Sequence, residues 1–400
     1  MRILLTNHFP FHGSGTGTST FDLATGLRAA GHDVRCLIVD REREGTEEFP
    51  VRRVVCNGDL PGADIPFDLP SFTTHPKSHR TFFEMSDDEL ALYRDVLREA
   101  IDDEVTKFDP QIIHCQHIWI QGSLVLETGV PYVLSAQEIN LLAYRQEPRY
   151  QLLAAQGAEN AGRILADSDW MVSEVCSVYD LDPERVAKIP NAVNLSLYQQ
   201  PPAPRPALFA ELGLPVLSGP LVVYGGKFVK IQGVDVLLNA AAHYEAEHPD
   251  VITVIGGDGP EEAALRRQLA ELGLKRTFIV SDPSRKQLAQ LYSHAHLTVV
   301  PSRRDAFELS AIESLASGTP VLASNVGGTP ELIQPTHGGL FPSENPAALS
   351  SCVLQALQEN WKKSKGPYAS QYAAAQHSID MWVLRVSLVY HTVVDERYRL

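Results

Sequence analysis

The sequence has few cysteines and no apolar run long enough to form a membrane-spanning helix. Its five cysteines are widely scattered along 400 residues, without a Cys-x-x-Cys pair. We therefore expect reduced, mostly buried thiols and a cytoplasmic protein. No stretch approaches the roughly 20 apolar residues of a membrane span. The short apolar start, residues 1–6, is expected to be a first buried strand rather than a signal peptide.

Positive charge is also scarce. The chain has 34 Lys and Arg against 49 Asp and Glu, which gives a formal net charge of −15. Nucleic-acid phosphates require a basic face, and anionic lipids attract basic segments, so we expect neither nucleic-acid binding nor stable membrane insertion. An apolar share of 44% with 21% charged residues is ordinary for a soluble globular protein. At this length, two or three domains can each bury a core.

Apolar strands alternate with amphipathic helices almost throughout the chain. This pattern is typical of parallel sheets with helices on both faces and predicts an α/β fold with two doubly wound Rossmann-like domains facing a central cleft. Expected strands lie at residues 2–6, 33–39, 51–55, 111–114, 132–135, 164–166, 186–189, 221–224, 251–255, 277–280, 297–300 and 321–323. Expected helices lie at 18–30, 87–107, 234–248, 261–272, 285–294, 309–317, 346–360 and about 368–398.

Two segments interrupt this alternation. Residues 57–80 are rich in Pro, Gly, Asp and His, and we expect a long loop there. Residues 199–206 read Q-Q-P-P-A-P-R-P, which is too proline-rich for a helix or a central strand. We therefore place a linker at residues 199–220, between a first domain at 1–198 and a second domain that begins at 221.

The most informative stretch runs from residue 304 to residue 333. Asp305 stands eight positions before Glu313, and a helical segment lies between them, followed by Gly-Thr-Pro, a short strand and a Gly-Gly turn. A helix N-terminus reached from a strand offers free backbone N–H groups that can hold phosphate. Carboxylates repel phosphate, so these two side chains are expected to contact sugar hydroxyls.

This stretch resembles the donor site of the retaining glycosyltransferases of family 4, which have the two-domain GT-B fold. The family carries two Glu separated by seven residues, at the positions of Asp305 and Glu313. Residues 257–261 match its Gly-Asp-Gly-Pro-Glu without change, and residues 318–321 match its Gly-Thr-Pro-Val turn. The resemblance implies that residues 1–198 face the acceptor, that 221–374 bind the nucleotide sugar, and that helices at about 375–400 cross back to the first domain.

The segment 225–233 resembles the family's Gly-Arg, four residues, then Lys-Gly, whose basic residues hold the donor diphosphate. Gly226 keeps the close backbone approach, but Lys227 replaces the Arg and Gln232 replaces the Lys. Lys227 keeps a charge without the two-pronged guanidinium, and Gln232 brings no charge. Lys230, Arg303 or Arg304 are candidates to restore it.

The resemblance also assigns roles around the helix start. The backbone N–H groups of Phe307, Glu308 and Leu309 would face the phosphate and the sugar, although Glu308 replaces a usual Gly and adds a negative charge. Glu313 would accept hydrogen bonds from the ribose hydroxyls, and Asp305 would hold hydroxyls of the transferred sugar.

Two segments of the first domain complete the expected site. Gly13, Ser14 and Gly15 belong to a glycine-rich loop after the first strand, which lies near the donor phosphates in similar transferases; it is not Gly-x-Gly-x-x-Gly, so a dinucleotide is weakly supported. Gln137 stands where the family has a His that contacts the transferred sugar, and an amide cannot carry the proton. We name Gln137, Asp305 and Lys227 as catalytic, and expect His114 and His117 to be structural.

A metal is not expected. Asp167-Ser168-Asp169 has the form of a metal-binding Asp-x-Asp, but a strand end before a helix is where Ser and Asp cap helices. The resemblance implies a metal-independent, retaining hexosyltransferase that uses no cofactor beyond a UDP- or GDP-linked sugar. Its acceptor would be a soluble small molecule, and a homodimer is compatible with the sequence. The alternatives are a pseudo-glycosyltransferase that joins a non-standard donor and nucleophile, an inactive nucleotide-sugar-binding protein and, as a poorer match, a sugar-nucleotide epimerase.

Overall fold

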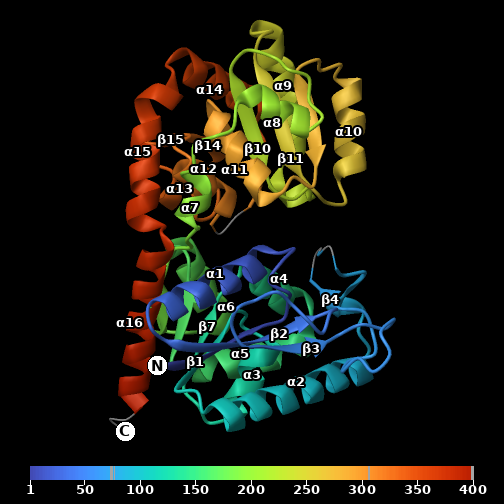
Figure 1. Cartoon of the computed structure of the whole chain (residues 1–400), viewed down its shortest axis with the longest axis vertical. Helices are drawn as coiled ribbons and strands as arrows, with labels where there is room; N and C mark the ends of the chain where they lie inside the picture. The colour runs from blue at the N-terminus through green and yellow to red at the C-terminus, as the bar shows by residue number, and fades with distance from the viewer. Residues whose placement is uncertain (73–74, 76, 305–306, 398–400) are drawn as a thin grey trace. The chain divides into compact units, whose positions relative to one another are not determined.

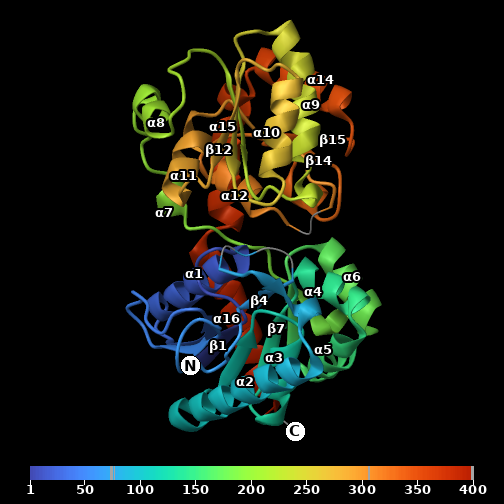
Figure 2. The same ribbon diagram turned by 90° about the vertical axis from the view of Figure 1, so that its right-hand side faces the viewer.

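The protein forms two compact units, each of which is described by itself (Figures 1 and 2). The first unit comprises Met1–Pro190 with Ile379–Leu400, and the second comprises Asn191–Ser378. The computed structural model describes residues 1–72, 75, 77–304 and 307–397. Both units are built on a parallel sheet, which confirms the predicted α/β class.

The first unit has a seven-stranded parallel sheet in the order β3-β2-β1-β6-β7-β8-β9. β1 lies between β2 and β6, so the direction of strand order reverses there, and ligands of such sheets bind beyond the carboxyl ends of the strands at this point. The strands are β1 (Arg2–Asn7), β2 (Asp33–Asp40), β3 (Val51–Val55), β6 (Ile112–Cys115), β7 (Tyr132–Ser135), β8 (Arg163–Ala166) and β9 (Val186–Lys188).

Helices cover both faces of this sheet, and Figure 1 shows α1 on the side opposite to α2 and α3. The predicted capping box at the start of α2 is confirmed: Ser86 Oγ accepts from the Glu89 N–H, and the Glu89 carboxylate accepts from the Ser86 N–H. The helices are α1 (Gly15–Ala29), α2 (Asp87–Phe108), α3 (Ile120–Glu127), α4 (Glu138–Gln146), α5 (Pro148–Asn160), α6 (Asp169–Tyr179) and α16 (Ile379–Arg397).

The last helix, α16, packs on the first unit and is joined to it by a buried hydrogen-bond chain. His114 Nδ1 lies 2.6 Å from the Tyr390 hydroxyl of α16, and His114 Nε2 lies 2.8 Å from Ser135 Oγ. Burial lowers the pKa of His114 to about 3, so the ring is neutral. The predicted structural role of His114 is confirmed, because both ring nitrogens have protein partners.

We expect Tyr390→Phe to destabilise the protein by about 1–2 kcal/mol, because it leaves a buried ring nitrogen of His114 without its partner. Comparison of thermal unfolding midpoints with the wild type measures this cost. Tyr368→Phe is the matched control, since Tyr368 on α15 is 58% exposed. Equal midpoints for the two variants would show that the His114–Tyr390 contact does not stabilise the fold.

The second unit has a six-stranded parallel sheet in the order β12-β11-β10-β13-β14-β15. Its strand order reverses between β10 and β13, as it does between β1 and β6 in the first unit. Alternate residues of β10 enter two separate cores, one on each face: Val223 lies in the first and Val222 in the second. The strands are β10 (Leu221–Gly225), β11 (Ile252–Gly257), β12 (Thr277–Ser281), β13 (Leu297–Val300), β14 (Val321–Ser324) and β15 (Gly338–Phe341).

Seven helices, two short α-helical turns and a 3-10 turn at Lys230–Gln232 surround this sheet within the described part of the unit. The longer ones are α8 (Arg205–Glu211), α9 (Val234–Glu247), α10 (Glu262–Glu271), α11 (Arg285–His294), α12 (Leu309–Ala316), α14 (Pro346–Gln358) and α15 (Trp361–Gln376). The short ones are α7 (Leu195–Tyr198) and α13 (Thr329–Leu332). Most predicted strands and helices are therefore present within one to three residues of their expected ends.

The prediction of a linker at 199–220 is wrong. The second unit begins near Asn191, and helix α8 occupies the middle of the supposed linker. Pro206 stands in the first turn of that helix, where its missing N–H costs no hydrogen bond. Leu208 and Phe209 are buried in the core on that face of the second sheet, so the segment is an integral part of the unit.

The predicted long loop at 57–80 is also more ordered than expected. It contains β4 (Pro70–Ser71), which pairs with β5 (Arg80–Thr81), and it buries Ile65 and Leu69. All five cysteines are free, and three of them, Cys36, Cys56 and Cys115, are buried, as predicted. Among the described residues, no helix is long and apolar enough to cross a membrane.

A partly buried lysine joins α15 to the Gly-Thr-Pro turn before β14. The Lys362 ammonium donates to Thr319 Oγ1, and among the described residues no carboxylate forms an ion pair with it. Burial lowers the pKa of Lys362 from its ordinary 10.5 to about 8. The folded protein therefore binds this proton less tightly than the unfolded chain does. The resulting penalty is complete below pH 8 and fades as the pH rises from about 8 to 10.5.

We expect Lys362→Met to stabilise the protein at pH 7 by about 1–2 kcal/mol, because the removed cost of a buried charge exceeds the lost hydrogen bond. The gain should shrink towards zero at pH 10. Thermal unfolding at both pH values, with Lys363→Met as the exposed neighbouring control, measures it. A variant less stable than the wild type at pH 7 would contradict this account.

Candidate functional site

The strongest candidate site lies where the strand order of the second unit reverses. Gly226 and Lys227 follow the end of β10, and Ser302 follows the neighbouring strand β13. The carboxyl ends of adjacent parallel strands lie at one edge of the sheet. Gly226 and Lys227 therefore lie at the edge where doubly wound sheets bind ligands.

Close contacts between backbone segments explain why glycine is needed at Gly257 and Gly259. A Cβ on Gly257 would lie 1.8 Å from the Gly226 carbonyl oxygen, and Gly259 has a φ of +148° with its backbone against Phe228. The Gly226 N–H donates to Gly256 O at 3.0 Å, so this amide is used within the protein. The motif therefore brings two chain segments into contact, and the donor-binding role of Gly226 stays a prediction.

Lys227 is partly buried at this edge. Burial lowers its pKa, and the nearby carboxylate of Asp258 opposes that shift. Asp258 belongs to the matching Gly-Asp-Gly-Pro-Glu segment, so one side chain of that motif acts on a predicted phosphate-binding lysine. A half-buried ammonium is a strong point charge for an anionic ligand.

Ser302, which the sequence analysis did not single out, joins two of the altered positions. Its hydroxyl lies 2.8 Å from Glu308 Oε1 and 3.3 Å from Gln232 Oε1. Ser310 Oγ also approaches Glu308 at 3.3 Å. The Glu308 carboxylate thus accepts hydrogen bonds from the hydroxyls of Ser302 and Ser310. Gln232 and Glu308 both contact the side chain of Ser302. The structure brings together two positions that are 76 residues apart.

The start of α12 carries the other predicted phosphate-binding groups. Glu308 is the residue before the first helical residue, Leu309, and Phe307 is buried with its ring 5.6 Å from that of His377. Asp305, predicted to be catalytic, lies outside the described residues. Glu308 and Leu309 are partly exposed, so the N–H groups at this helix start are not sealed inside the unit.

Glu313 lies one turn further along α12 and has a partner that the sequence analysis missed. The Tyr198 hydroxyl donates to Glu313 Oε1 at 2.5 Å. Tyr198 is the last residue of α7, and its side chain is buried. The proposed ribose-binding carboxylate is therefore fixed by a neighbouring helix.

Arg303, one of the three cations named as candidates to restore the lost charge, is already paired with two carboxylates. Its guanidinium makes two bonds to the Asp235 carboxylate, at 2.7 and 2.8 Å, one to the Lys230 carbonyl at 2.6 Å and one to Glu344 at 2.9 Å. Such a two-pronged pair holds the group firmly. Arg303 instead ties the loop after β13 to the start of α9.

In the first unit, the glycine-rich loop is organised around the start of α1. Ser14 is the N-cap, and its Oγ accepts from the Gly17 N–H at 3.0 Å. Gly13 has a φ of +97°, which favours glycine, and a Cβ on Gly17 would lie 2.0 Å from the Pro10 carbonyl oxygen. The side chain of Ser14 is thus used in capping, whereas ligand contact by Gly13, Ser14 and Gly15 stays a prediction.

Gln137 stands at the start of α4, in the loop after β7. Its N–H donates to Asn140 Oδ1 at 3.0 Å, and Asn140 Nδ2 lies 3.1 Å from His117 Nδ1. The amide nitrogen can only donate, so His117 accepts at Nδ1. Burial lowers the pKa of His117 to about 3, which leaves a neutral ring with its proton on Nε2.

His8, just after β1, repeats this arrangement and was missed from the sequence. The Tyr93 hydroxyl lies 2.9 Å from His8 Nδ1, and burial raises the pKa of Tyr93, so that hydroxyl keeps its proton. Burial, and then the neighbouring His117, lower the pKa of His8. Within the described chain, neither His8 Nε2 nor His117 Nε2 has a partner. The strand-order reversal of the first unit therefore holds two buried imidazole nitrogens without a protein partner, and that of His117 carries the ring proton. The structural role predicted for His117 does not account for both of its ring nitrogens.

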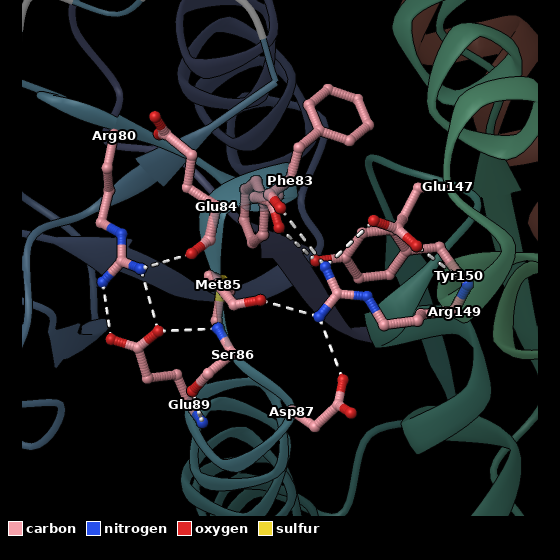
Figure 3. Close-up of polar contacts among 11 residues, drawn as sticks. Arg80, Phe83, Glu84, Met85, Ser86, Asp87, Glu89, Glu147, Arg149 and Tyr150 are labelled. Atoms are coloured by element: carbon pink, nitrogen blue, oxygen red, sulfur yellow. Dashed lines mark hydrogen bonds and ion pairs between the residues drawn. The ribbon is translucent and has the colours of Figure 1, made fainter.

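Arg80 and Arg149 hydrogen-bond to the segment before α2, as Figure 3 shows. Arg149 donates to the Met85 carbonyl at 2.7 Å and to the carboxylates of Glu147 and Asp87 at 3.0 and 3.1 Å. Arg80 makes two bonds to Glu89, at 2.8 and 2.9 Å. An anionic ligand at either guanidinium would have to displace a carboxylate.

The Asp167-Ser168-Asp169 segment is a helix cap, as predicted. Ser168 Oγ accepts from the Met171 N–H at 3.2 Å at the start of α6, and Asp169 pairs with Lys188 at 2.7 Å. Among the described residues, no group of three or more His, Cys, Asp or Glu side chains could hold a metal ion.

Comparisons with known proteins agree with this geometry. Residues 214–374 match the family described as "Glycosyl transferases group 1", and residues 13–197 match "Glycosyltransferase Family 4". A D-inositol 3-phosphate glycosyltransferase of Thermobispora bispora is 30% identical over 327 residues, covering 76% of this chain and 75% of the relative. The corresponding Arthrobacter protein is 30% identical over 71% of each chain.

Solved structures show the same fold. Sucrose-phosphate synthase from Thermosynechococcus elongatus has a TM-score of 0.78 at 21% identity, covering 99% of this chain and 100% of that one. HepE from Anabaena, solved with UDP and glucose, has a TM-score of 0.75 at 17% identity, covering 96% of this chain and 98% of that one. The two matched segments, the relatives and the two parallel sheets show that the chain is a glycosyltransferase. It belongs to the group 1 glycosyltransferases of the GT-B fold.

Proposed function

We propose that this glycosyltransferase moves a sugar from a UDP- or GDP-linked donor to a soluble small-molecule acceptor, with retention of the anomeric configuration. The observation that carries the proposal is the convergence of Lys227, Gln232 and Glu308 where the strand order of the second unit reverses, with Glu313 on the adjoining helix. Relatives are named for transfer to D-inositol 3-phosphate, and HepE is described with UDP-glucose, which supports this class of substrates.

In this mechanism the departing diphosphate takes the proton of the acceptor hydroxyl as the sugar is transferred on the same face. The protein then supplies orientation and charge stabilisation rather than a nucleophile. Lys227 acts as a point charge on the diphosphate, and the N–H groups of Glu308 and Leu309 add partial positive charge at the helix start. Gln137 hydrogen-bonds the transferred sugar, and we expect no required metal or further cofactor.

The altered residues favour a second candidate, an inactive nucleotide-sugar-binding protein or a pseudo-glycosyltransferase with another donor. Compared with the family pattern, Gln232 removes one positive charge and Glu308 adds one negative charge beside the proposed diphosphate. Both changes weaken the attraction for a pyrophosphate. The two candidates differ in one outcome, the consumption of a nucleotide sugar.

The test incubates the purified protein with UDP- and GDP-linked glucose, galactose and mannose, in the presence of inositol or inositol 3-phosphate. NMR of the products identifies consumed donor and the anomeric configuration. Retained configuration in a transferred sugar supports the main proposal. Nucleotide binding without consumption of any donor would favour the inactive protein, and an inverted product would overturn the retaining mechanism.

A further inference from the structure

Three helices of the second unit meet around the carboxylate of Glu313. α7 packs against both α11 and α12, and the Tyr198 hydroxyl at its end donates to Glu313 Oε1 at 2.5 Å. Arg285, the first residue of α11, hydrogen-bonds to the same hydroxyl. Tyr198 is only 2% exposed, whereas Glu313 is partly exposed, so the carboxylate is held from the protein side and still reaches solvent.

The direction of each hydrogen bond in this chain is fixed by its donors. Burial first, and then the negative charge of Glu313, raise the pKa of Tyr198, so the hydroxyl keeps its proton. A guanidinium can only donate, so Arg285 donates to the Tyr198 oxygen. The proton of that hydroxyl therefore goes to Glu313, which is the acceptor at the end of the relay.

We propose that Tyr198 is a positioning residue that holds Glu313 in the orientation needed to accept the ribose hydroxyls of the donor nucleotide. The inference rests on the proposed function and adds to it a residue that sets the preference for ribonucleotides. A Glu side chain has three rotatable bonds, and fixing one oxygen from behind removes most of that freedom before the ligand arrives. The relay thus prepares the carboxylate for a pair of adjacent hydroxyls.

The same hydrogen bond between Tyr198 and Glu313 could serve only to stabilise the packing of α7 against α12. The two roles differ in what Tyr198→Phe changes. If the contact only stabilises packing, its loss lowers the unfolding midpoint but leaves the discrimination between ribose and deoxyribose unchanged. Loss of positioning lets Glu313 rotate, so the contribution of the ribose 2′-hydroxyl to binding falls.

The test is calorimetry with UDP, GDP and ADP and with their 2′-deoxy forms. We expect the wild type to bind the preferred ribonucleotide about tenfold or more tightly than its 2′-deoxy form, as for a hydrogen bond to a charged group. In Tyr198→Phe this ratio should fall about threefold or more, with a similar fall in ribonucleotide affinity. In a Glu313→Ala background, Tyr198→Phe should change the ratio no further, because the two residues act through one contact.

Tyr244→Phe is the matched control. Tyr244 is also buried in the second unit, and its hydroxyl bonds Thr253 at 2.6 Å, on the face of the sheet that does not contain Tyr198. It should lower stability without changing the ribose ratio. A wild type that binds none of the nucleotides would overturn the proposed function itself. A wild type that discriminates, with Tyr198→Phe keeping its ratio, would overturn only the positioning role, and no discrimination in the wild type would remove the ribose contact of Glu313.

Discussion

A variant with Gln232→Lys and Glu308→Gly is expected to bind nucleoside diphosphates about 10- to 100-fold more tightly than the wild type. The pair of changes adds two units of positive charge where we place the diphosphate. A charged hydrogen bond contributes about 1.5–3 kcal/mol, against about 1 kcal/mol for a neutral one. Calorimetry with UDP and GDP at two salt concentrations measures the gain, which should shrink as salt screens the charges.

The single changes should not simply add. In Gln232→Lys alone, the new ammonium would lie close to the Glu308 carboxylate, because Ser302 already contacts both positions. Much of its charge would then be neutralised within the protein, so we expect a smaller gain than in the double variant. Gln355→Lys is the matched control, since that exposed Gln on α14 lies near a carboxylate too, with Nε2 2.8 Å from Glu359 Oε1, but away from the proposed site. Unchanged affinity in the double variant would mean that the diphosphate does not lie over these residues.

The sequence predicts the two parallel sheets because buried parallel strands form short continuous apolar runs, such as residues 221–224, between helices with one apolar face. It fails where short-range signals oppose long-range packing. The prolines at 199–206 predict a linker, but Leu208 and Phe209 are held by the core that they complete. The helices α3 to α5 were not predicted. α3 and α4 are short, and α3 is buried along most of its length, so it has little of the amphipathic pattern that reveals a helix.

The candidate site could be predicted only in part. Glycines and charged residues at motif spacing identified the strand ends, Lys227 and Glu313, because these positions are close in the chain to the turns that place them. Ser302 and Tyr198 carry no local signal, since a serine after a strand and a tyrosine at the end of a short helix are common. Their roles follow from contacts over 70 and 115 residues of sequence, which a single sequence does not reveal.

Glu313→Ala is expected to weaken nucleoside-diphosphate binding by about 1–3 kcal/mol, or about 5- to 150-fold, because the ribose hydroxyls lose a charged acceptor. The substitution also leaves the buried Tyr198 hydroxyl without its acceptor, so some loss of stability accompanies it. The two effects have to be measured separately. Calorimetry with UDP and GDP gives the first, and the thermal unfolding midpoint of the nucleotide-free protein gives the second.

Glu313→Gln removes the negative charge of the side chain but keeps its shape, so it tests the contribution of the charge alone. The amide oxygen can still accept from Tyr198 and from a hydroxyl, so this variant should fold like the wild type and bind with an affinity between those of the wild type and Glu313→Ala. Glu271→Ala, at the exposed end of α10, is the control for removing a carboxylate elsewhere in the unit. If Glu313→Ala bound nucleotide as tightly as Glu271→Ala, the ribose would not contact α12. In that case Glu313 would serve only to satisfy Tyr198, and the donor would have to be held by Lys227 and the helix start alone.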